Sequence, residues 1–454
     1  MSAPPLDVAG KRVAVVGLGQ SGLAAVRLLR ELGAHVAVAD QKPASELMDA
    51  LGERDVEVHG GGAYESALAG ADLVVVSPGV PMALDPLRRA RASGARMIGE
   101  LELAARHLTG KVIAVTGTNG KSTTVTWIGE LMRAAGFEPF VGGNLGTPLA
   151  EAALAALRGR RWDFLVVEVS SFQLETIETF HPWIGAILNV TPDHLDRYPS
   201  MEAYASAKFR LLENQTAEDY VVLNVDDPWL ARSAVRSRGR RVLFSRRGPV
   251  EPGVFLDGEA IVSTVEGPRE DLCRVRDLHV RGVHNIENAM AAGAVAALAG
   301  CPIEVIGRGL RAFRGLEHVM EAVRVVRGVT YINDSKGTNV DATIKALESV
   351  ETPVVLIAGG REKGGEYPGL AAAVRRRTRR VILLGEARPH LRRALEGVCP
   401  ISEVESLDEA VREAVASAVP GDTVLLSPAC ASFDMFTDYK DRGRQFKERV
   451  HGLE

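Results

Sequence analysis

The residues with the clearest chemical potential lie in a glycine-rich segment at residues 117–124, which reads GTNGKSTT. An apolar run at residues 112–115 precedes this segment, and a helical pattern follows it. In such a strand–turn–helix, backbone N–H groups can surround phosphate oxygens, a lysine can neutralise the outer phosphates and a hydroxyl can bind Mg²⁺. Lys121 and Ser122 supply the last two groups. Val115 stands where the full Walker A pattern has its first glycine, but the context still predicts a nucleotide-binding turn.

Two further polar side chains, later in the sequence, each lie at or after the end of a predicted strand. Glu168 lies near the end of the apolar run at residues 164–169, and His194 follows the run at residues 184–189. Ligands of α/β proteins bind at the carboxyl ends of strands, and a carboxylate there can hold Mg²⁺. Taken alone, Glu168 could instead cap the backbone of the next serines, and a lone loop histidine is usually a surface residue. Their shared position beside one phosphate-binding turn favours a metal site.

A second glycine-rich turn lies near the N-terminus. Gly17, Gly19 and Gly22 form GxGxxG after an apolar strand, and Asp40 follows the next strand at residues 35–39. This pattern is typical of dinucleotide-binding proteins, in which the glycines let backbone N–H groups approach a diphosphate. A tight turn without a ligand is the alternative. Too few residues separate the two turns to complete the usual NAD-binding sheet, which favours a different nucleotide diphosphate.

The C-terminal third contains two more polar loops, at residues 333–339 (NDSKGTN) and 427–434 (SPACASFD). Each follows a predicted strand. Each alone could be a helix cap with ordinary turn chemistry. Together they predict a polar rim along one edge of a sheet, where a small charged ligand could bind.

The elements that must position these residues alternate between strand and helix in three successive blocks. The apolar strands are predicted at residues 13–16, 35–39, 73–76, 112–115, 164–169, 184–189, 329–332, 354–358, 381–384 and 423–426. Alternation of this kind indicates parallel sheets. We therefore predict an α/β fold of three domains in series: a Rossmann-like domain (1–99), a P-loop-type ATPase domain (100–315) and a second Rossmann-like domain (316–454).

Length and composition agree with this organisation. The 454 residues correspond to about three domains at roughly 150 residues each. A hydrophobic content of 46% excludes a disordered or fibrous chain, and a net charge of −4 excludes a global basic field for nucleic acid. None of the four cysteines is in CxxC spacing, so neither a zinc site nor a disulfide framework is indicated. With no signal-peptide pattern at residues 1–12 and no apolar run long enough for a bilayer, we expect a cytoplasmic protein.

Three segments, in this order, resemble the muramoyl peptide ligases (Mur ligases) of cell-wall synthesis. They are residues 168–175 (EVSSFQLE), 189–198 (NVTPDHLDRY) and 427–434, and the resemblance extends over essentially the whole chain. Folylpolyglutamate synthases share the phosphate-binding turn, whereas residues 17–22 and 77–79 resemble the branch that adds D-glutamate. The resemblance implies ATP-dependent amide formation in peptidoglycan precursor synthesis. ATP would phosphorylate the carboxylate of UDP-N-acetylmuramoyl-L-alanine, and the amine of D-glutamate would attack the resulting acyl phosphate.

The resemblance also implies roles for individual residues. The ATP site would comprise Gly117, Thr118, Asn119, Gly120, Lys121, Ser122 and Thr123 at the phosphates, Asn144 near the γ-phosphate, Asn285 and Asn288 at adenine and Asp334 at ribose. One Mg²⁺ would be held by Ser122 and Glu168, and a second by His194 and Lys208, the latter as a carbamate. The UDP-substrate would contact Gln20, Ser21, Asp40, Gln41, Ser77 and Ser170. D-Glutamate would contact Thr338, Lys363, Ser432 and Tyr439.

Two positions depart from the family pattern. Val319 stands where the family commonly has an arginine that reaches toward ATP. Either Arg314 or Arg324 could supply the missing charge, or the protein tolerates weaker ATP binding. Tyr439 keeps the expected aromatic ring, which is often a phenylalanine, and adds a hydroxyl.

Two other functions remain as alternatives. One is a related ligase that adds another amino acid, and the other is a non-catalytic binding protein on this scaffold. The second would be expected to lack Lys121, Glu168, His194 or Lys208, and all four are present. We expect small-molecule substrates, no nucleic acid, no membrane insertion and a monomer.

Overall fold

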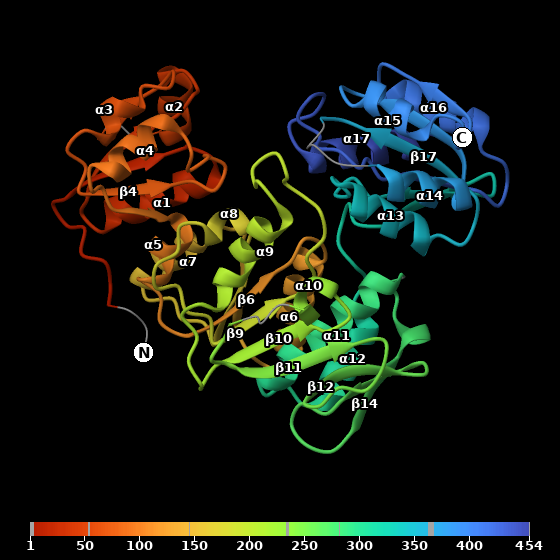
Figure 1. Cartoon of the computed structure of the whole chain (residues 1–454), viewed down its shortest axis with the longest axis horizontal. Helices are drawn as coiled ribbons and strands as arrows, with labels where there is room; N and C mark the ends of the chain where they lie inside the picture. Colours follow the sequence, from red (N-terminus) through yellow and green to blue (C-terminus); the bar gives the residue numbers. More distant parts are fainter. Residues whose placement is uncertain are drawn as a thin grey trace.

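The computed structural model describes residues 4–52, 55–144, 146–232, 236–280, 282–361 and 367–453 (Figure 1). It confirms the predicted α/β fold, with three largely parallel sheets that follow one another along the chain. In Figure 1 the N-terminal domain (red to orange) and the C-terminal domain (teal to blue) both border the central domain. Within the described residues, no helix has the length and apolar character needed to cross a membrane.

The N-terminal domain is built on a five-stranded parallel sheet in the order β3-β2-β1-β4-β5. Its inner strands are runs of valine and alanine buried on both faces, which is typical of a parallel sheet covered by helices. The strands are β1 (Arg12–Val16), β2 (His35–Ala39), β3 (Glu57–His59), β4 (Leu73–Val76) and β5 (Met97–Gly99). The helices are α1 (Gln20–Glu31), α2 (Ala44–Leu51), α3 (Tyr64–Leu68) and α4 (Asp85–Ala92). Helix α5 (Glu100–Ala105) follows β5 and leads into the central domain.

The central domain contains a nine-stranded sheet in the order β14-β13-β12-β11-β10-β9-β6-β8-β7. Pairing is parallel from β7 to β12, and β13 and β14 add an antiparallel edge. The strands are β6 (Lys111–Thr116), β7 (Pro139–Gly143), β8 (Phe164–Glu168), β9 (Ile184–Ile187), β10 (Tyr220–Asn224), β11 (Arg240–Ser245), β12 (Gly253–Asp257), β13 (Ala260–Ser263) and β14 (Glu270–Arg274). The helices are α6 (Lys121–Ala134), α7 (Leu149–Leu157), α8 (Ser171–Leu174), α9 (Met201–Phe209), α10 (Pro228–Arg232), α11 (Val283–Leu298) and α12 (Ile303–Ala312).

The C-terminal domain contains a six-stranded sheet in the order β15-β16-β20-β17-β18-β19, in which only the β15–β16 pair is antiparallel. The strands are β15 (Glu321–Val326), β16 (Val329–Asn333), β17 (Val354–Gly359), β18 (Thr378–Leu384), β19 (Ile401–Glu403) and β20 (Thr423–Leu426). The helices are α13 (Val340–Ser349), α14 (Pro368–Arg377), α15 (Arg388–Leu395), α16 (Leu407–Ser417) and α17 (Tyr439–His451).

The order of strands in the central sheet brings the predicted site residues together at the carboxyl ends of neighbouring strands. Strand β6 lies between β8 and β9, and Val115 pairs with Glu168. The turn after β6 and the polar side chains after β8 and β9 are therefore neighbours, although the sequence separates them widely. The alanine-rich helix α11 packs against α6, because its small side chains allow the two helices to approach closely.

Candidate active site

The phosphate-binding turn is fixed by a close approach between its backbone and helix α11. Gly120 has a left-handed backbone conformation (φ 85°), immediately before α6 begins at Lys121. A Cβ atom on Gly120 would lie 2.2 Å from Oδ1 of Asn288. Glycine is therefore required both by conformation and by space. The N-terminus of the 14-residue helix α6 offers backbone N–H groups suited to an anion such as a phosphate.

Two lysines donate hydrogen bonds to carbonyl oxygens of this turn. Lys121 Nζ lies 2.8 Å from the Gly117 oxygen and 2.7 Å from the Thr118 oxygen. Lys208 Nζ, on α9, lies 2.8 Å from the same Gly117 oxygen and is 1% exposed. Burial and the Lys121 ammonium lower the pKa of Lys208 well below its usual range.

Glu168 connects three parts of the site at the end of β8. Its Oε2 accepts a hydrogen bond of 2.5 Å from Ser122 Oγ, and its Oε1 accepts one of 2.7 Å from Asn144 Nδ2. Lys336, from the C-terminal domain, donates to the same Ser122 hydroxyl. Hydroxyl and carboxylate oxygens are the ligands that Mg²⁺ prefers, so this donor set fits the metal that a phosphate-binding turn requires.

His194 has a left-handed backbone (φ 56°), which directs its side chain to the same cavity as the turn. Its Nε2 lies 3.5 Å from Asp193 Oδ2, and its ring meets the edge of Phe172 at 4.6 Å between centroids. Tyr204 lies between His194 and Lys208: its ring is 6.3 Å from the imidazole and 4.5 Å from the Lys208 nitrogen. The structure thus brings Lys208 and His194 to the same side of the turn.

A cavity of about 260 Å³ separates the central and C-terminal domains at this point. The predicted ATP and metal residues on its wall are Thr118, Asn119, Gly120, Lys121, Ser122, Thr123, Asn144, Glu168, His194, Asn288 and Asp334. Asn285 lies behind this wall, where its Oδ1 accepts from Asn288 Nδ2 at 3.2 Å. Asp334 accepts a hydrogen bond from Ser427 Oγ at 2.7 Å, and burial raises its pKa to about 7.

The residues predicted to contact the amino acid are only partly brought together. Thr338 and Tyr439 line the cavity, and burial raises the pKa of the Tyr439 phenol to about 12. Ser432 is buried in the loop after β20 and is not part of the described cavity wall. Lys363 lies outside the described residues.

Five of the six residues predicted to bind the UDP-substrate lie in or beside the first glycine-rich turn, whereas the sixth, Ser170, lies in the central domain. Ser77 Oγ donates to the Gly17 oxygen at 2.6 Å, and the Asp40 carboxylate accepts from the backbone N–H of Leu18 at 2.6 Å and of Lys42 at 3.0 Å. Gln20 and Ser21 begin α1, Gln41 follows Asp40, and Ser170 caps α8 through the N–H of Gln173. The described cavity wall includes none of these six residues.

The structure adds residues that the sequence reasoning missed. Asp341 accepts from Asn119 Nδ2 at 2.6 Å and from Thr191 Oγ1 at 2.8 Å, and Asn339 Nδ2 donates to Asp193 Oδ2 at 3.1 Å. These contacts, together with the hydrogen bond from Lys336 to Ser122, join the C-terminal domain to the central domain. Lys336 and Asn339 belong to the polar loop at residues 333–339, which the sequence predicted at the edge of a sheet. The sequence did not predict that these residues contact the central domain.

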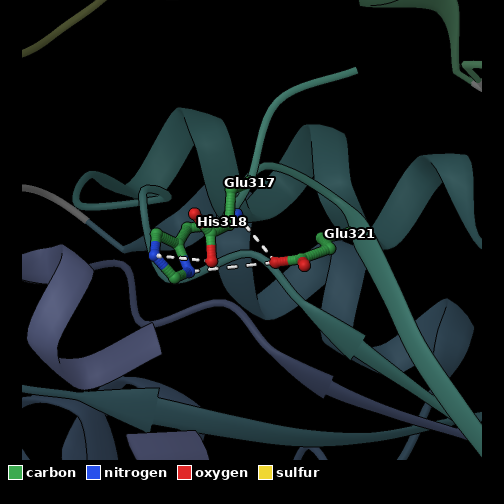
Figure 2. A group of neighbouring side chains, drawn as sticks. All are labelled: Glu317, His318 and Glu321. Atoms are coloured by element: carbon green, nitrogen blue, oxygen red, sulfur yellow. Dashed lines mark hydrogen bonds and ion pairs between the residues drawn. The ribbon is translucent and has the colours of Figure 1, made fainter. Parts of the chain in front are cut away.

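The segment that carries Val319 is held by a cluster of polar side chains that could suggest a metal site. One ligand atom each from Glu317, His318 and Glu321 lies within 4.8 Å of the others (Figure 2). The Lys447 ammonium, however, lies 2.8 Å from Glu317 Oε1 and 2.6 Å from Glu321 Oε1. Because Lys447 already compensates these charges, the cluster is explained as an anchor of the segment.

Val319 itself lines the cavity, as expected if it replaces an arginine directed toward ATP. Arg324 lies outside the described wall, and its Nη1 donates to the carbonyls of His451 and Leu453 at 2.9 Å each, so nothing here supports the expectation that it supplies the missing charge. Arg314 is exposed and lies outside the described wall. The lysines on that wall are Lys121, Lys336 and Lys345.

Comparison with known proteins shows which family this chain resembles. Family profiles match residues 11–99 (Mur ligase MurD-like, N-terminal domain), 115–296 (Mur ligase middle domain) and 320–430 (Mur ligase, glutamate ligase domain). The UDP-N-acetylmuramoylalanine--D-glutamate ligase of Pelotomaculum thermopropionicum is 46% identical over 454 residues, covering 98% of this chain and 99% of that protein. The enzyme of the same name from Syntrophotalea carbinolica is 43% identical over 450 residues, covering 99% of both.

Solved structures with lower identity share the fold. A pseudomurein peptide ligase type C from Methanothermus fervidus has a TM-score of 0.61 at 18% identity, covering 98% of this chain and 100% of that one. The UDP-N-acetylmuramate-alanine ligase MurC of Thermotoga maritima has a TM-score of 0.60 at 21% identity, with the same coverage. The full-length identity and the matching profiles agree with the cavity geometry. The chain therefore belongs to the Mur ligase family, and within it to the MurD-like ligases.

Proposed function

We propose that this protein is an ATP-dependent ligase that joins D-glutamate to UDP-N-acetylmuramoyl-L-alanine in peptidoglycan synthesis. Relatives that cover its full length at 41–46% identity carry the name of this activity. The observation that carries the proposal is a cavity in which a phosphate-binding turn on one domain faces Thr338 and Tyr439 on another. We also propose that the protein acts as a monomer. Because ATP is a substrate, we place the reaction in the cytoplasm.

The chemistry requires activation of a carboxylate. A carboxylate is a poor electrophile because its negative charge repels nucleophiles and it offers oxide as a leaving group. In the proposed reaction a carboxylate oxygen of the UDP-substrate attacks the γ-phosphorus of ATP and ADP leaves. The D-glutamate nitrogen then attacks the acyl carbon and loses a proton, and the C–O bond breaks to release phosphate. Positioning and charge neutralisation are the main contributions expected of the protein.

The residues of the phosphate-binding turn would hold the nucleotide. Lys121 would exchange its two carbonyl partners for phosphate oxygens, and Asn144 would contact the γ-phosphate. Asn288 and Asp334 on the cavity wall would contact adenine and ribose, with Asn285 behind Asn288. Ser122 and Glu168 would hold one Mg²⁺, which supplies charge neutralisation at the phosphates.

His194 and Lys208 would hold a second Mg²⁺. An ammonium group repels a divalent cation, so Lys208 would act as a carbamate, formed when its neutral amine adds CO₂. The burial of Lys208 and its depressed pKa support this proposal, because they favour the neutral amine.

The two organic substrates would bind through different sets of residues. The residues Gln20, Ser21, Asp40, Gln41, Ser77 and Ser170 would contact the UDP-substrate. Thr338, Lys363, Ser432 and Tyr439 would contact D-glutamate, for which a lysine and short hydroxyl donors suit a dicarboxylic amino acid. The D-configuration rests on the family alone.

Phosphate release from ATP tests this proposal against its alternatives. The assay uses UDP-N-acetylmuramoyl-L-alanine with D-glutamate, L-glutamate, L-lysine or meso-diaminopimelate as separate acceptors. We expect rapid release only with D-glutamate. Faster release with lysine or diaminopimelate would indicate a related ligase, and no release with any acceptor would indicate a non-catalytic protein.

A further inference from the structure

Arg197 extends from the central domain to the N-terminal domain and contacts both. Its Nη1 donates to the Pro78 oxygen at 2.9 Å, and its Nη2 to the Val80 oxygen at 3.4 Å. The same Nη2 donates to Glu175 Oε2, in the central domain, at 2.6 Å. The side chain is 15% exposed, so most of these contacts are shielded from water.

The two carbonyls that Arg197 binds belong to a turn packed on the first glycine-rich segment. The turn closes with a 3.0 Å hydrogen bond from the Val80 N–H to the Ser77 oxygen. A Cβ atom on Gly17 would lie 2.6 Å from Val80 Cγ2 and 3.0 Å from Ser77 Cβ. A displacement of residues 77–80 would therefore change the shape of the glycine-rich turn that we assign to the UDP-substrate.

At its other end, Arg197 belongs to the same tight turn as His194. The backbone N–H groups of Arg197 and Tyr198 both donate to the His194 oxygen at 3.0 Å. The guanidinium lies 4.0 Å from the centre of the Phe172 ring, and that ring packs against the His194 imidazole. A continuous stack therefore runs from residues 77–80 through Arg197 and Phe172 to His194.

Glu175 fixes the orientation of the guanidinium within this stack. Its Oε1 accepts from the Tyr198 hydroxyl at 2.6 Å, which leaves Oε2 directed at Arg197. Among side chains, only a planar guanidinium can donate hydrogen bonds to a carboxylate and two carbonyls while it stacks on an aromatic ring. A lysine at position 197 would keep the charge and lose this geometry.

We propose that Arg197 is a positioning residue that couples the UDP-substrate turn at residues 77–80 to the metal-ligand turn that carries His194. The proposal rests on the proposed function for the identity of the substrate. Arg197 touches no reacting atom and acts through the two turns that it connects. Loss of the guanidinium uncouples the turns and weakens UDP-substrate binding, while the nucleotide site on β6 and α6 keeps its affinity.

The test compares Arg197→Lys and Arg197→Ala with the control Arg210→Lys. Arg210 also binds two backbone carbonyls, those of Leu174 and Ile177, but both lie inside the central domain. Calorimetry gives the Kd of UDP-N-acetylmuramoyl-L-alanine and, separately, of Mg²⁺-ADP. We expect both Arg197 variants to weaken UDP-substrate binding by about tenfold or more, the effect of one lost charge-assisted hydrogen bond, and to change ADP binding less than twofold. Arg210→Lys should change neither.

Hydrogen exchange of the ligand-free proteins provides a readout that does not depend on the substrate. In both Arg197 variants, exchange should increase at residues 77–84 and at residues 193–198 together. Unchanged exchange in these segments, or equal losses of ADP and UDP-substrate affinity with a lowered Tm, would overturn the coupling role. If the wild-type protein does not bind the UDP-substrate, the proposed function fails, whereas the exchange data still decide whether Arg197 connects the two turns.

Discussion

Lys208 is the residue whose chemical state the site restricts most. It is buried beside the phosphate-binding turn, close to the Lys121 ammonium and on the His194 side of the cavity. At a separation of ~4 Å and an effective dielectric constant of ~20, an ammonium and a divalent cation repel each other by about 8 kcal/mol. A carbamate reverses the sign of this interaction. In the sequence, Lys208 is an unremarkable helix lysine, and only the family resemblance assigned it a role.

We predict that Lys208→Ala lowers ligase turnover by about a hundredfold or more, because the anionic group that would hold a charge-neutralising Mg²⁺ at the reacting phosphate is lost. Circular dichroism should show that the variant remains folded. Acetate, which can occupy the vacated space, should restore part of the turnover. Near wild-type turnover in Lys208→Ala or Lys208→Arg would show that the carbamate role is wrong.

Substitution of Val319 tests whether the missing arginine affects ATP binding. The side chain lines the cavity, and neither Arg314 nor Arg324 takes the place of an arginine there. A charge-assisted contact to phosphate contributes ~1.5–3 kcal/mol. Val319→Arg should therefore lower the KM for ATP by about tenfold or more in steady-state assays if no other residue compensates. An unchanged KM would indicate that Lys336 or Lys345 already supplies the charge, and a raised KM would show that the site has been rebuilt.

At the scale of elements, the sequence predicted those strands whose own residues carry a strong signal. The strands β2, β4 and β20 occupy the predicted residues, because runs of buried β-branched residues bounded by polar turns are a strong local signal. The short strands β3, β5 and β19 were missed, since three residues give little periodicity, and the longer strands β7 and β10 to β15 were not predicted either. Contacts such as that between Asp341 and Asn119 were also missed, because they depend on how two domains meet.

Helix α5 contributes a buried carboxyl that connects two elements near the site. Glu100 Oε1 accepts from the Ala150 N–H at 2.6 Å, at the start of α7, and Oε2 has no partner among the described residues. Helix α7 follows the loop that carries Asn144. Burial raises the pKa of Glu100 to about 7. The carboxyl thus retains its proton in the folded protein to a higher pH than in the unfolded chain.

This pKa predicts a specific dependence of stability on pH. Because the folded pKa is above the unfolded value of 4.5, the stabilisation is complete below about pH 4.5 and is lost as pH rises toward 7. The free energy of unfolding of the wild-type protein relative to Glu100→Gln should fall by about 3 kcal/mol over this range. Urea denaturation of both proteins from pH 4.5 to 8 measures the difference. Parallel pH profiles would contradict the prediction.

At the scale of the whole molecule, side-chain hydrogen bonds hold the C-terminal domain against the central domain. Asp341, at the start of α13, binds Asn119 of the phosphate-binding turn and Thr191 of the loop that precedes His194. In this arrangement the nucleotide residues and the proposed amino-acid residues face one cavity. The segment around Gly315 connects the two domains, and the left-handed backbone of this glycine (φ 89°) makes it a natural hinge.

We predict that Asp341→Ala shifts the molecule toward an open arrangement. Small-angle scattering should show a larger radius of gyration for the ligand-free variant than for the wild-type protein, and an ATP analogue with the UDP-substrate should compact both. The control is Glu348→Ala on the same helix, which removes an exposed ion pair with Arg376. Equal radii for the wild-type protein and Asp341→Ala would show that these hydrogen bonds do not control closure.

Transfer of an oxygen atom tests the proposed reaction most directly. The substrate is UDP-N-acetylmuramoyl-L-alanine with ¹⁸O in both oxygens of its carboxylate, supplied with ATP and D-glutamate, and mass spectrometry follows the phosphate and the amide. We predict one ¹⁸O in each released phosphate, one ¹⁸O retained in the amide carbonyl, and one amide for each ATP consumed. Unlabelled phosphate, or phosphate release without the D-glutamyl amide, would contradict activation of this carboxylate by phosphorylation.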